Sequence, residues 1–182
     1  MIEESASRQA QDVAADFRAL FDKNFGFVWN ALRRFGVAES DREDLANEVF
    51  FRVYKAMAQY DKTRPPRPWL LAFTARVASE HRRRARHRRE VLGDPPDAAA
   101  PQSAPEGGVE RAEQRALLAE ALDALDDDKR AVFVMHDLEE VTTADIAHAL
   151  ELPEGTVSSR LRSARAELAA AVKRLRARKG ER

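Results

Sequence analysis

Apolar residues recur at steps of three and four along most of this chain, which is the spacing of one face of an α-helix. The clearest run precedes residue 36 and comprises Phe17, Leu20, Phe21, Phe25, Val28, Leu32 and Phe35. We find no convincing strand, although the apolar segment 131–135 is ambiguous between helix and strand. Because only 7 Gly and 8 Pro occur among 182 residues, the sequence predicts an all-α fold.

A segment rich in proline and glycine, VLGDPPDAAAPQSAPEGGVE at 91–110, interrupts the helical pattern. Few apolar residues anchor this segment, and its composition is typical of a flexible linker. We therefore expect two small helical domains, one at 1–90 and one at 111–182.

Proline and capping residues divide the first domain into helices. We expect a helix at 42–60, capped by Ser40 or Asp41, because both side chains can accept a hydrogen bond from the first helical turn. The prolines of DKTRPPRP end it, and a further helix is expected to begin near Trp69.

The second domain ends in a helix-turn-helix pattern. A short helical segment, TTADIAHAL, is followed by a tight turn at Leu152-Pro153 and by a second helix. At 100° per residue, one stripe of that helix contains Val157, Leu161, Ala164, Leu168, Val172 and Leu175, and we expect it to be buried. The small hydroxyl and arginine side chains outside the stripe are candidates to enter a DNA groove: Thr156, Ser158, Ser159, Arg160, Arg162, Ser163 and Arg165. An ordinary helical hairpin with a polar face is the alternative interpretation.

A formal net charge of zero conceals strongly segregated charges. Seven arginines and one acid lie between residues 76 and 89, and nine basic residues and two acids lie between residues 160 and 182. Two basic blocks favour two contacts with a polyanion over two solvated faces. The intervening segment 120–145 holds nine acids and two bases.

Several classes of protein are not indicated by the sequence. There is no cysteine, no signal peptide, and no apolar run near the ~20 residues of a membrane span, so we expect a cytoplasmic protein without membrane insertion. The four histidines lack metal-ligand spacing, so we predict no metal, no cofactor and no catalysis. We interpret the acidic triplet 126–128 as favouring the start of a helix and His136-Asp137 as a partly exposed pair.

Motifs in both domains resemble one family. In the second domain these are Arg130–Phe133, Asp145–Ala147, Gly155–Val157, Ser159–Leu161 and Ala164-Arg165, in that order. In the first they are DLANEVFFRVYKAM and PWLLAFTARVASEHRRRARHRR. Together they resemble the extracytoplasmic-function (ECF) sigma factors of the sigma-70 superfamily, over most of residues 17–175.

The resemblance implies a partner and a role for each domain. The first domain would dock on bacterial core RNA polymerase and open the −10 element of promoter DNA, the second would read the −35 element, and an anti-sigma factor would be a further partner. The implied polymerase-binding residues are Asp44, Asn47, Glu48, Phe51 and Lys55. On the 42–60 helix one stripe contains Leu45, Val49, Val53, Ala56, Met57 and Tyr60, and Phe51 lies opposite it among charges. From the residues alone, packing of Phe51 on a neighbouring helix is the favoured interpretation, and the resemblance reverses it.

The implied −10 contacts belong to the first arginine block: Arg76, Arg82, Arg83, Arg84 and Arg86. They would form an electrostatic cradle for a single strand. We interpret Trp69 as structural. The chain departs from the usual family pattern at Thr74-Ala75-Arg76, Glu80, Ser158 and Ser163, so the −10 and −35 sequences that it prefers are left open.

Two alternatives to a sigma factor remain from the sequence. A stand-alone helix-turn-helix regulator would bind specific DNA tightly without polymerase. A sigma-like adaptor would bind polymerase without opening a promoter.

Overall fold

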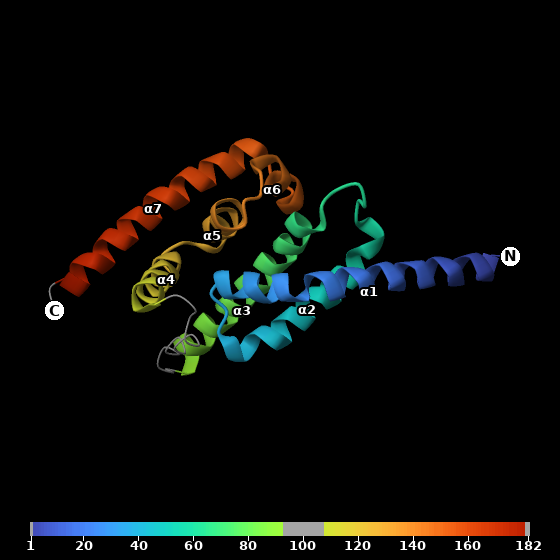
Figure 1. The fold of residues 1–182 in the computed structure, drawn as a ribbon, viewed down its shortest axis with the longest axis horizontal. Coiled ribbons are helices and arrows are strands. Elements are labelled where there is room, and N and C mark those ends of the chain that lie inside the picture. Colours follow the sequence, from blue (N-terminus) through green and yellow to red (C-terminus); the bar gives the residue numbers. More distant parts are fainter. Residues whose placement is uncertain (1, 93–107, 181–182) are drawn as a thin grey trace.

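The computed structural model describes residues 2–92 and 108–180 of the chain (Figure 1). Its seven α-helices are α1 (Ile2–Arg34), α2 (Arg42–Ala56), α3 (Pro66–Leu92), α4 (Gly108–Leu122), α5 (Asp127–Phe133), α6 (Thr143–Leu150) and α7 (Glu154–Gly180). Short helical turns lie at Glu39–Asp41, Met57–Gln59 and Val134–Leu138. No strand occurs within these two ranges, and the ambiguous segment 131–135 is helical. The prediction of an all-α fold is confirmed.

The helices α1, α2 and α3 pack together into the N-terminal domain. Its core is aliphatic at the centre, with Val28, Leu32, Val49, Val53, Leu70 and Leu71 fully buried. Phe50 adds an aromatic layer that the periodicity of α2 did not reveal. Its ring is 2% exposed and lies 4.7–6.4 Å, centroid to centroid, from the rings of Phe17, Phe21 and Phe25 on α1. Each such pair of rings stabilises the fold by ~0.5–1.5 kcal/mol beyond the contribution of the buried apolar area, so this layer stabilises the packing of α1 against α2.

The bounds of α2 and α3 differ from the sequence-based ones. The helix α2 ends at Ala56 and is followed by a 3₁₀ turn at Met57–Gln59. The helix α3 begins at Pro66, three residues before Trp69. Proline suits a first helical turn because the missing N–H has no intrahelical partner there. The predicted side-chain cap on α2 was wrong: Asp41 occupies the N-cap position without bonding the helix, and its carboxylate lies 3.2 Å from His81 Nε2.

The helices α4, α5 and α6 pack against the long α7 in the C-terminal half. Asp126 caps α5 through a 2.8 Å bond from the Lys129 N–H, so the acidic triplet does favour a helix start. Thr142 caps α6, and Glu151, the residue that follows the helix, adopts the left-handed conformation. The predicted stripe on α7 faces these helices: Val157, Leu161 and Ala164 are buried, and Leu168, Val172 and Leu175 are half-buried. The helix-turn-helix is thus α6 followed by α7.

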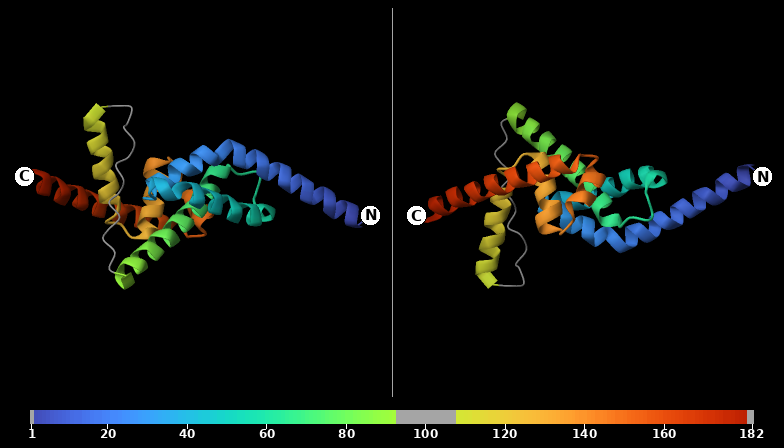
Figure 2. Two further views of the ribbon diagram at one scale, coloured as in Figure 1. Left: turned by 90° about the horizontal axis from the view of Figure 1, so that it is seen from below. Right: turned by 90° about the horizontal axis from the view of Figure 1, so that it is seen from above.

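The two halves of the described chain contact each other through α3, which packs against α5 and α6 (Figures 1 and 2). The N-terminal end of α1 and the C-terminal end of α7 project to opposite ends of the molecule. Arg130 on α5 is 2% exposed and bridges the halves. Its Nη1 donates to the Phe35 carbonyl at 3.1 Å and its Nη2 to the Leu122 carbonyl at 2.5 Å. Residues 93–107 of the predicted linker lie outside the described residues.

Gly36 follows the end of α1 with φ of +84°, and a Cβ there would lie 2.6 Å from Arg130 Nη1. Gly36→Ala is therefore expected to lower the free energy of unfolding by more than about 1 kcal/mol. Gly26→Ala is the matched control, because a Cβ on that helical glycine meets nothing within 4 Å. It should instead raise stability by ~0.5–1 kcal/mol. Urea denaturation followed by circular dichroism measures both, and equal midpoints would contradict this account.

Candidate protein and nucleic-acid interfaces

The predicted polymerase-binding residues lie on α2, outside its buried stripe. Phe51 is 53% exposed, so it does not pack into the core of a neighbouring helix. The Lys55 ammonium lies 4.2 Å from the centre of its ring, a cation–π contact that holds both side chains at the surface. Asp44 and Asn47 are exposed and Glu48 is half-buried. The arrangement offers one aromatic ring among charges of both signs.

Sequence reasoning missed Tyr54, which enlarges this surface. It is 48% exposed, and its ring meets the Phe17 ring edge-on at 5.0 Å. The three-residue spacing from Phe51 places both aromatic rings on the same side of α2. A cluster of exposed large aromatic side chains is typical of a protein-binding surface, and the i, i+3 spacing was the available signal.

An ion-pair network fixes α2 against the arginine-rich α3. Arg52 Nε donates to Glu48 Oε1 at 2.7 Å, and its two Nη atoms donate to the two carboxylate oxygens of Glu80 at 2.8 Å each. These hydrogen bonds lower the pKa of Glu80 and raise that of Arg52. Glu80, one of the departures from the family pattern, thus sets the position of α3 relative to the face of α2.

Glu80→Gln is expected to lower the free energy of unfolding at pH 7 by about 1 kcal/mol, because Arg52 loses a bidentate charged partner. A carboxylate with a lowered folded-state pKa contributes stability above its unfolded pKa of about 4.3. That contribution disappears as the pH falls through the lowered folded-state pKa. Urea titrations of wild type and variant should therefore differ at pH 7 and converge as the pH falls through the lowered folded-state pKa of Glu80. A difference that persisted in acid would contradict this role for Glu80.

The predicted arginine cradle on α3 is only partly open to solvent. Arg83 and Arg84 are exposed, and Arg84 Nη2 lies 3.8 Å from Glu80. Arg82 is 17% exposed at its side chain and donates to Asp127 of α5. Burial, and then the nearby Arg130, lower the pKa of Arg82 to about 10. Arg86 lies 3.5 Å from the same carboxylate.

A pocket of about 300 Å³ lies beside the N-terminal end of α3. The rings of Tyr60 and Trp69 stack at 4.6 Å, Phe73 meets Trp69 edge-on, and Arg76 lies at the rim. Aromatic walls with adjacent guanidinium groups suit the stacking of an unpaired base. Trp69, which we interpreted as structural, is half-buried and does line this pocket. The pocket is also lined by residues of α6 and by Glu151, which follows it: Asp145, His148, Ala149 and Glu151.

The candidate −35 residues occupy the first three turns of α7, and several already have partners. Arg160 Nη2 lies 2.6 Å from Asp128 Oδ2, and the Ser163 hydroxyl donates to Glu167 at 3.2 Å. The Ser159 hydroxyl donates to the Thr156 carbonyl at 2.9 Å. Ser158 and Arg162 remain exposed, and their side chains have no polar partner within the part of the chain that the structure describes.

Arg165 joins α7 to the turn Val134–Leu138. Its Nε donates to Asp137 Oδ2 at 2.8 Å and its Nη2 to Oδ1 at 2.5 Å. These bonds from Arg165, assisted by His136, lower the pKa of Asp137. The pair His136-Asp137 is therefore part of a structural ion-pair cluster, and DNA would have to displace Asp137 to engage Arg165.

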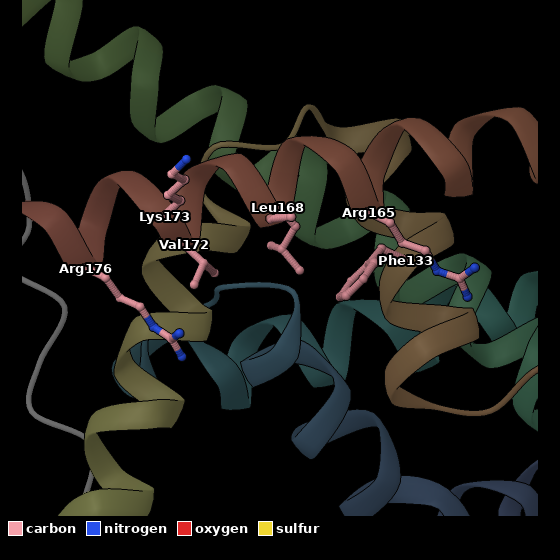
Figure 3. A pocket seen from close by; sticks show the side chains of 7 residues that line it. Phe133, Arg165, Leu168, Val172, Lys173 and Arg176 are labelled. Carbon is pink, nitrogen blue, oxygen red and sulfur yellow. The ribbon is translucent and has the colours of Figure 1, made fainter.

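An apolar groove of about 450 Å³ runs along the second half of α7. Figure 3 shows that Leu168 and Val172 point from α7 to the side on which Phe133 lies. Lys173 points to the opposite side of α7. Arg165 and Arg176 lie at the two ends of the groove (Figure 3). An apolar floor with basic ends suits an acidic amphipathic protein segment better than the edges of bases.

Both halves of the chain are similar in sequence to known proteins. Residues 20–88 match the profile of the family described as Sigma-70 region 2, and residues 115–168 match that of Sigma-70, region 4. The ECF RNA polymerase sigma factor SigL of Mycobacterium tuberculosis is 35% identical over 150 residues, which are 81% of this chain and 84% of SigL. The chain belongs to the ECF sigma factors of the sigma-70 superfamily. It is therefore an alternative sigma factor, which binds core RNA polymerase and promoter DNA and directs transcription initiation.

Two solved structures share its fold. RpoE, in its co-crystal structure with the anti-sigma factor NepR from Bartonella quintana, matches this sigma factor with a TM-score of 0.67 at 19% identity, over 87% of this chain and 97% of that one. CnrH, solved with the cytosolic domain of CnrY, matches with a TM-score of 0.61 at 24% identity, over 90% of this chain and 94% of that one. None of the helices described for this sigma factor is long and apolar enough to cross a bilayer.

Proposed function

We propose that the two halves of this sigma factor divide its work. Residues 1–90 dock on core polymerase and open the −10 element, residues 111–182 read the −35 element, and residues 91–110 tether them. The two family profiles support this division, because they match separately at 20–88 and 115–168. The two sets of candidate contacts also lie on different helices, α2 and α3 in one half and α7 in the other.

The exposed face of α2 is the proposed polymerase-binding surface, and Phe51 is the observation that carries it. A ring that is 53% exposed beside charged neighbours is unfavourable in water and favourable when a partner covers it. We assign Asp44, Asn47, Glu48 and Lys55 to the polar rim of the same surface. We add Tyr54 to the apolar centre because it is 48% exposed three residues from Phe51.

The −10 element is proposed to meet α3 as a single strand. Arg82, Arg83, Arg84 and Arg86 would neutralise phosphates, and an unpaired base would stack in the pocket of Tyr60 and Trp69, with Arg76 at its rim. The pocket supplies aromatic stacking and the arginines supply charge, so neither alone accounts for duplex opening.

The start of α7 is proposed to enter the major groove at the −35 element. Small side chains at Thr156, Ser158, Ser159 and Ser163 allow close approach of the helix to the bases. Arg162 is the proposed base-reading side chain, because it is exposed and has no partner to displace within the described chain. Arg160 and Arg165 would contact phosphates after leaving Asp128 and Asp137.

We further propose a cytoplasmic location, no catalytic activity of its own, no cofactor or metal, and an anti-sigma protein as a partner. Two solved structures of similar fold support the last point: RpoE is bound to the anti-sigma factor NepR, and CnrH is bound to the cytosolic domain of CnrY. The basic-ended apolar groove on α7 offers a surface of suitable chemistry for such a protein.

Size-exclusion chromatography of the purified protein with bacterial core RNA polymerase tests the proposal. We expect co-elution, and weak binding of duplex DNA by the free protein, because the two modules gain effective concentration only when polymerase fixes their spacing. No co-elution together with tight specific DNA binding would identify a stand-alone regulator. Co-elution without transcription from any promoter would identify an adaptor.

A further inference from the structure

The second half of α7 is strongly basic. Between Leu168 and Gly180 the sequence has five basic residues and no acid. The structure describes four of these basic side chains, and all four are exposed: Lys173, Arg174, Arg176 and Arg178. None of the four forms an ion pair with another residue of the part of the chain that the structure describes. Their charge is therefore available to attract a polyanion.

Lys173 lies on the same side of α7 as Arg162, the proposed base-reading residue. It follows Arg162 by eleven positions, and at 100° per residue eleven steps complete three turns plus about 20°. At 1.5 Å per residue the two residues are ~16 Å apart along the helix axis. Figure 3 shows that Lys173 points to the side of α7 opposite Leu168, which packs against the core. This side therefore faces away from the other helices of the C-terminal half.

Between Arg162 and Lys173 this side of α7 carries only small side chains. Ala166 and Ala169 lie within about 40° of Arg162 around the helix, and both are exposed. Methyl groups allow a DNA strand to approach the helix closely. The major groove is ~12 Å wide and ~8.5 Å deep, so the phosphates that flank it lie ~10–15 Å from a base edge at its floor. The spacing of ~16 Å therefore brings Lys173 beside these phosphates when Arg162 reads a base.

We propose that Lys173 binds a DNA phosphate at the edge of the −35 element and extends the DNA contact of α7 beyond the base-reading residues. The inference rests on the proposed −35 role of α7. A lysine ammonium is a compact charge with three donors, which suits a phosphate and carries no base preference. Arg174, the next residue, is rotated by about 120° from Arg162 around the helix and does not face the same strand.

Lys173→Ala and Arg174→Ala in the full chain form a matched pair, because each removes one exposed charge without a partner in the described chain. Alanine favours a helix, so neither change should unfold α7. The probe is a short fluorescein-labelled mixed-sequence duplex, and anisotropy measures its binding constant K at salt concentrations from about 50 to 200 mM.

We expect Lys173→Ala to reduce the steepness of log K against log[salt] by ~0.9, the value for one phosphate contact. At about 0.1 M salt this corresponds to binding that is about fivefold to tenfold weaker. Arg174→Ala should reduce the steepness by less than about half of that amount. Lys173→Arg keeps the charge and should restore the wild-type salt dependence.

Equal effects of Lys173→Ala and Arg174→Ala would overturn the proposal, because the side of the helix would then not matter. A wild-type salt dependence for Lys173→Ala would also overturn it. If that variant instead bound core polymerase less tightly, the partner of Lys173 would be an acidic protein surface rather than DNA.

Transcription by core RNA polymerase separates this inference from the proposed function. Lys173→Ala should lower transcription from all recognised promoters by a similar factor, without changing the base preferred at any −35 position. If wild type directs transcription while Lys173→Ala and Arg174→Ala bind the duplex alike, the phosphate contact fails and the proposed function stands. If Lys173→Ala alone reduces the salt dependence but wild type supports no transcription, the proposed function fails and only the DNA contact of α7 stands.

Discussion

Phe51→Glu is expected to abolish co-elution of this sigma factor with core RNA polymerase. Loss of a central aromatic anchor from a protein interface costs ~2–4 kcal/mol, which weakens affinity by about 30- to 1,000-fold. The new carboxylate adds an unpaired charge at a surface that the partner must dehydrate. Because Phe51 is 53% exposed in the free chain, the same change should alter folding stability by less than about 0.5 kcal/mol.

Ala58→Glu is the matched control for Phe51→Glu. It introduces the same charge at an exposed position in the turn Met57–Gln59, which follows α2 and lies beyond the proposed docking surface. It should co-elute as wild type does, and thermal melts should confirm that both variants are folded. Co-elution of Phe51→Glu at wild-type strength would show that polymerase does not bind this face of α2.

Arg162→Ala is expected to reduce promoter-specific transcription by about 5- to 150-fold while leaving core binding intact. A side chain that reads a base edge is worth ~1–3 kcal/mol of discrimination, and Arg162 has no intramolecular partner in the described chain whose loss would disturb the fold. Transcription with saturating core polymerase, on promoters altered singly at each −35 position, measures the effect. The variant should also relax the preference at one of these positions.

Arg174→Ala serves as the control for Arg162→Ala. It removes an arginine that is also exposed from the same helix, about three turns further along and outside the proposed groove-facing residues. Its effect should be small and uniform across promoters, as expected for a nonspecific electrostatic contribution. A loss of core binding by Arg162→Ala would contradict the proposed division between the two halves.

The sequence predicted those features that depend on local spacing. The stripe beginning at Val157 and Leu161 was predicted by a 3.6-residue period and is buried in the structure. The same period on α2 placed Phe51 outside the buried stripe, and it is exposed. Both features follow from where side chains project around a helix, which is fixed by the backbone alone.

Features that depend on distant pairs were not predictable from spacing. Arg82 and Asp127 are 45 positions apart, and Arg34 and Glu139 are 105 positions apart. Many acids and arginines are available in a chain with 34% charged residues, and periodicity does not indicate which of them pair. The arginine block was therefore predicted to be one open cradle, although part of it is covered.

The aromatic features were missed for a related reason. Phe50 is buried because Phe17, Phe21 and Phe25 of α1 reach across α2, so its burial depends on tertiary packing rather than on the stripe of its own helix. Trp69 is half-buried beside Tyr60 in a pocket that forms only when the segment before α3 folds back over it. A ring that lines a pocket, such as that of Trp69, cannot be told from a core ring by its own sequence neighbours.

Transcription by core RNA polymerase from a library of randomised upstream DNA, with and without the purified sigma factor, tests the central claim most directly. The account predicts sigma-dependent transcripts from templates that share two short sequence blocks at a fixed separation, one for each half of the chain. It also predicts that the free protein alone does not select these templates. The absence of sigma-dependent transcripts from every template, or tight selection of the same DNA without polymerase, would contradict it.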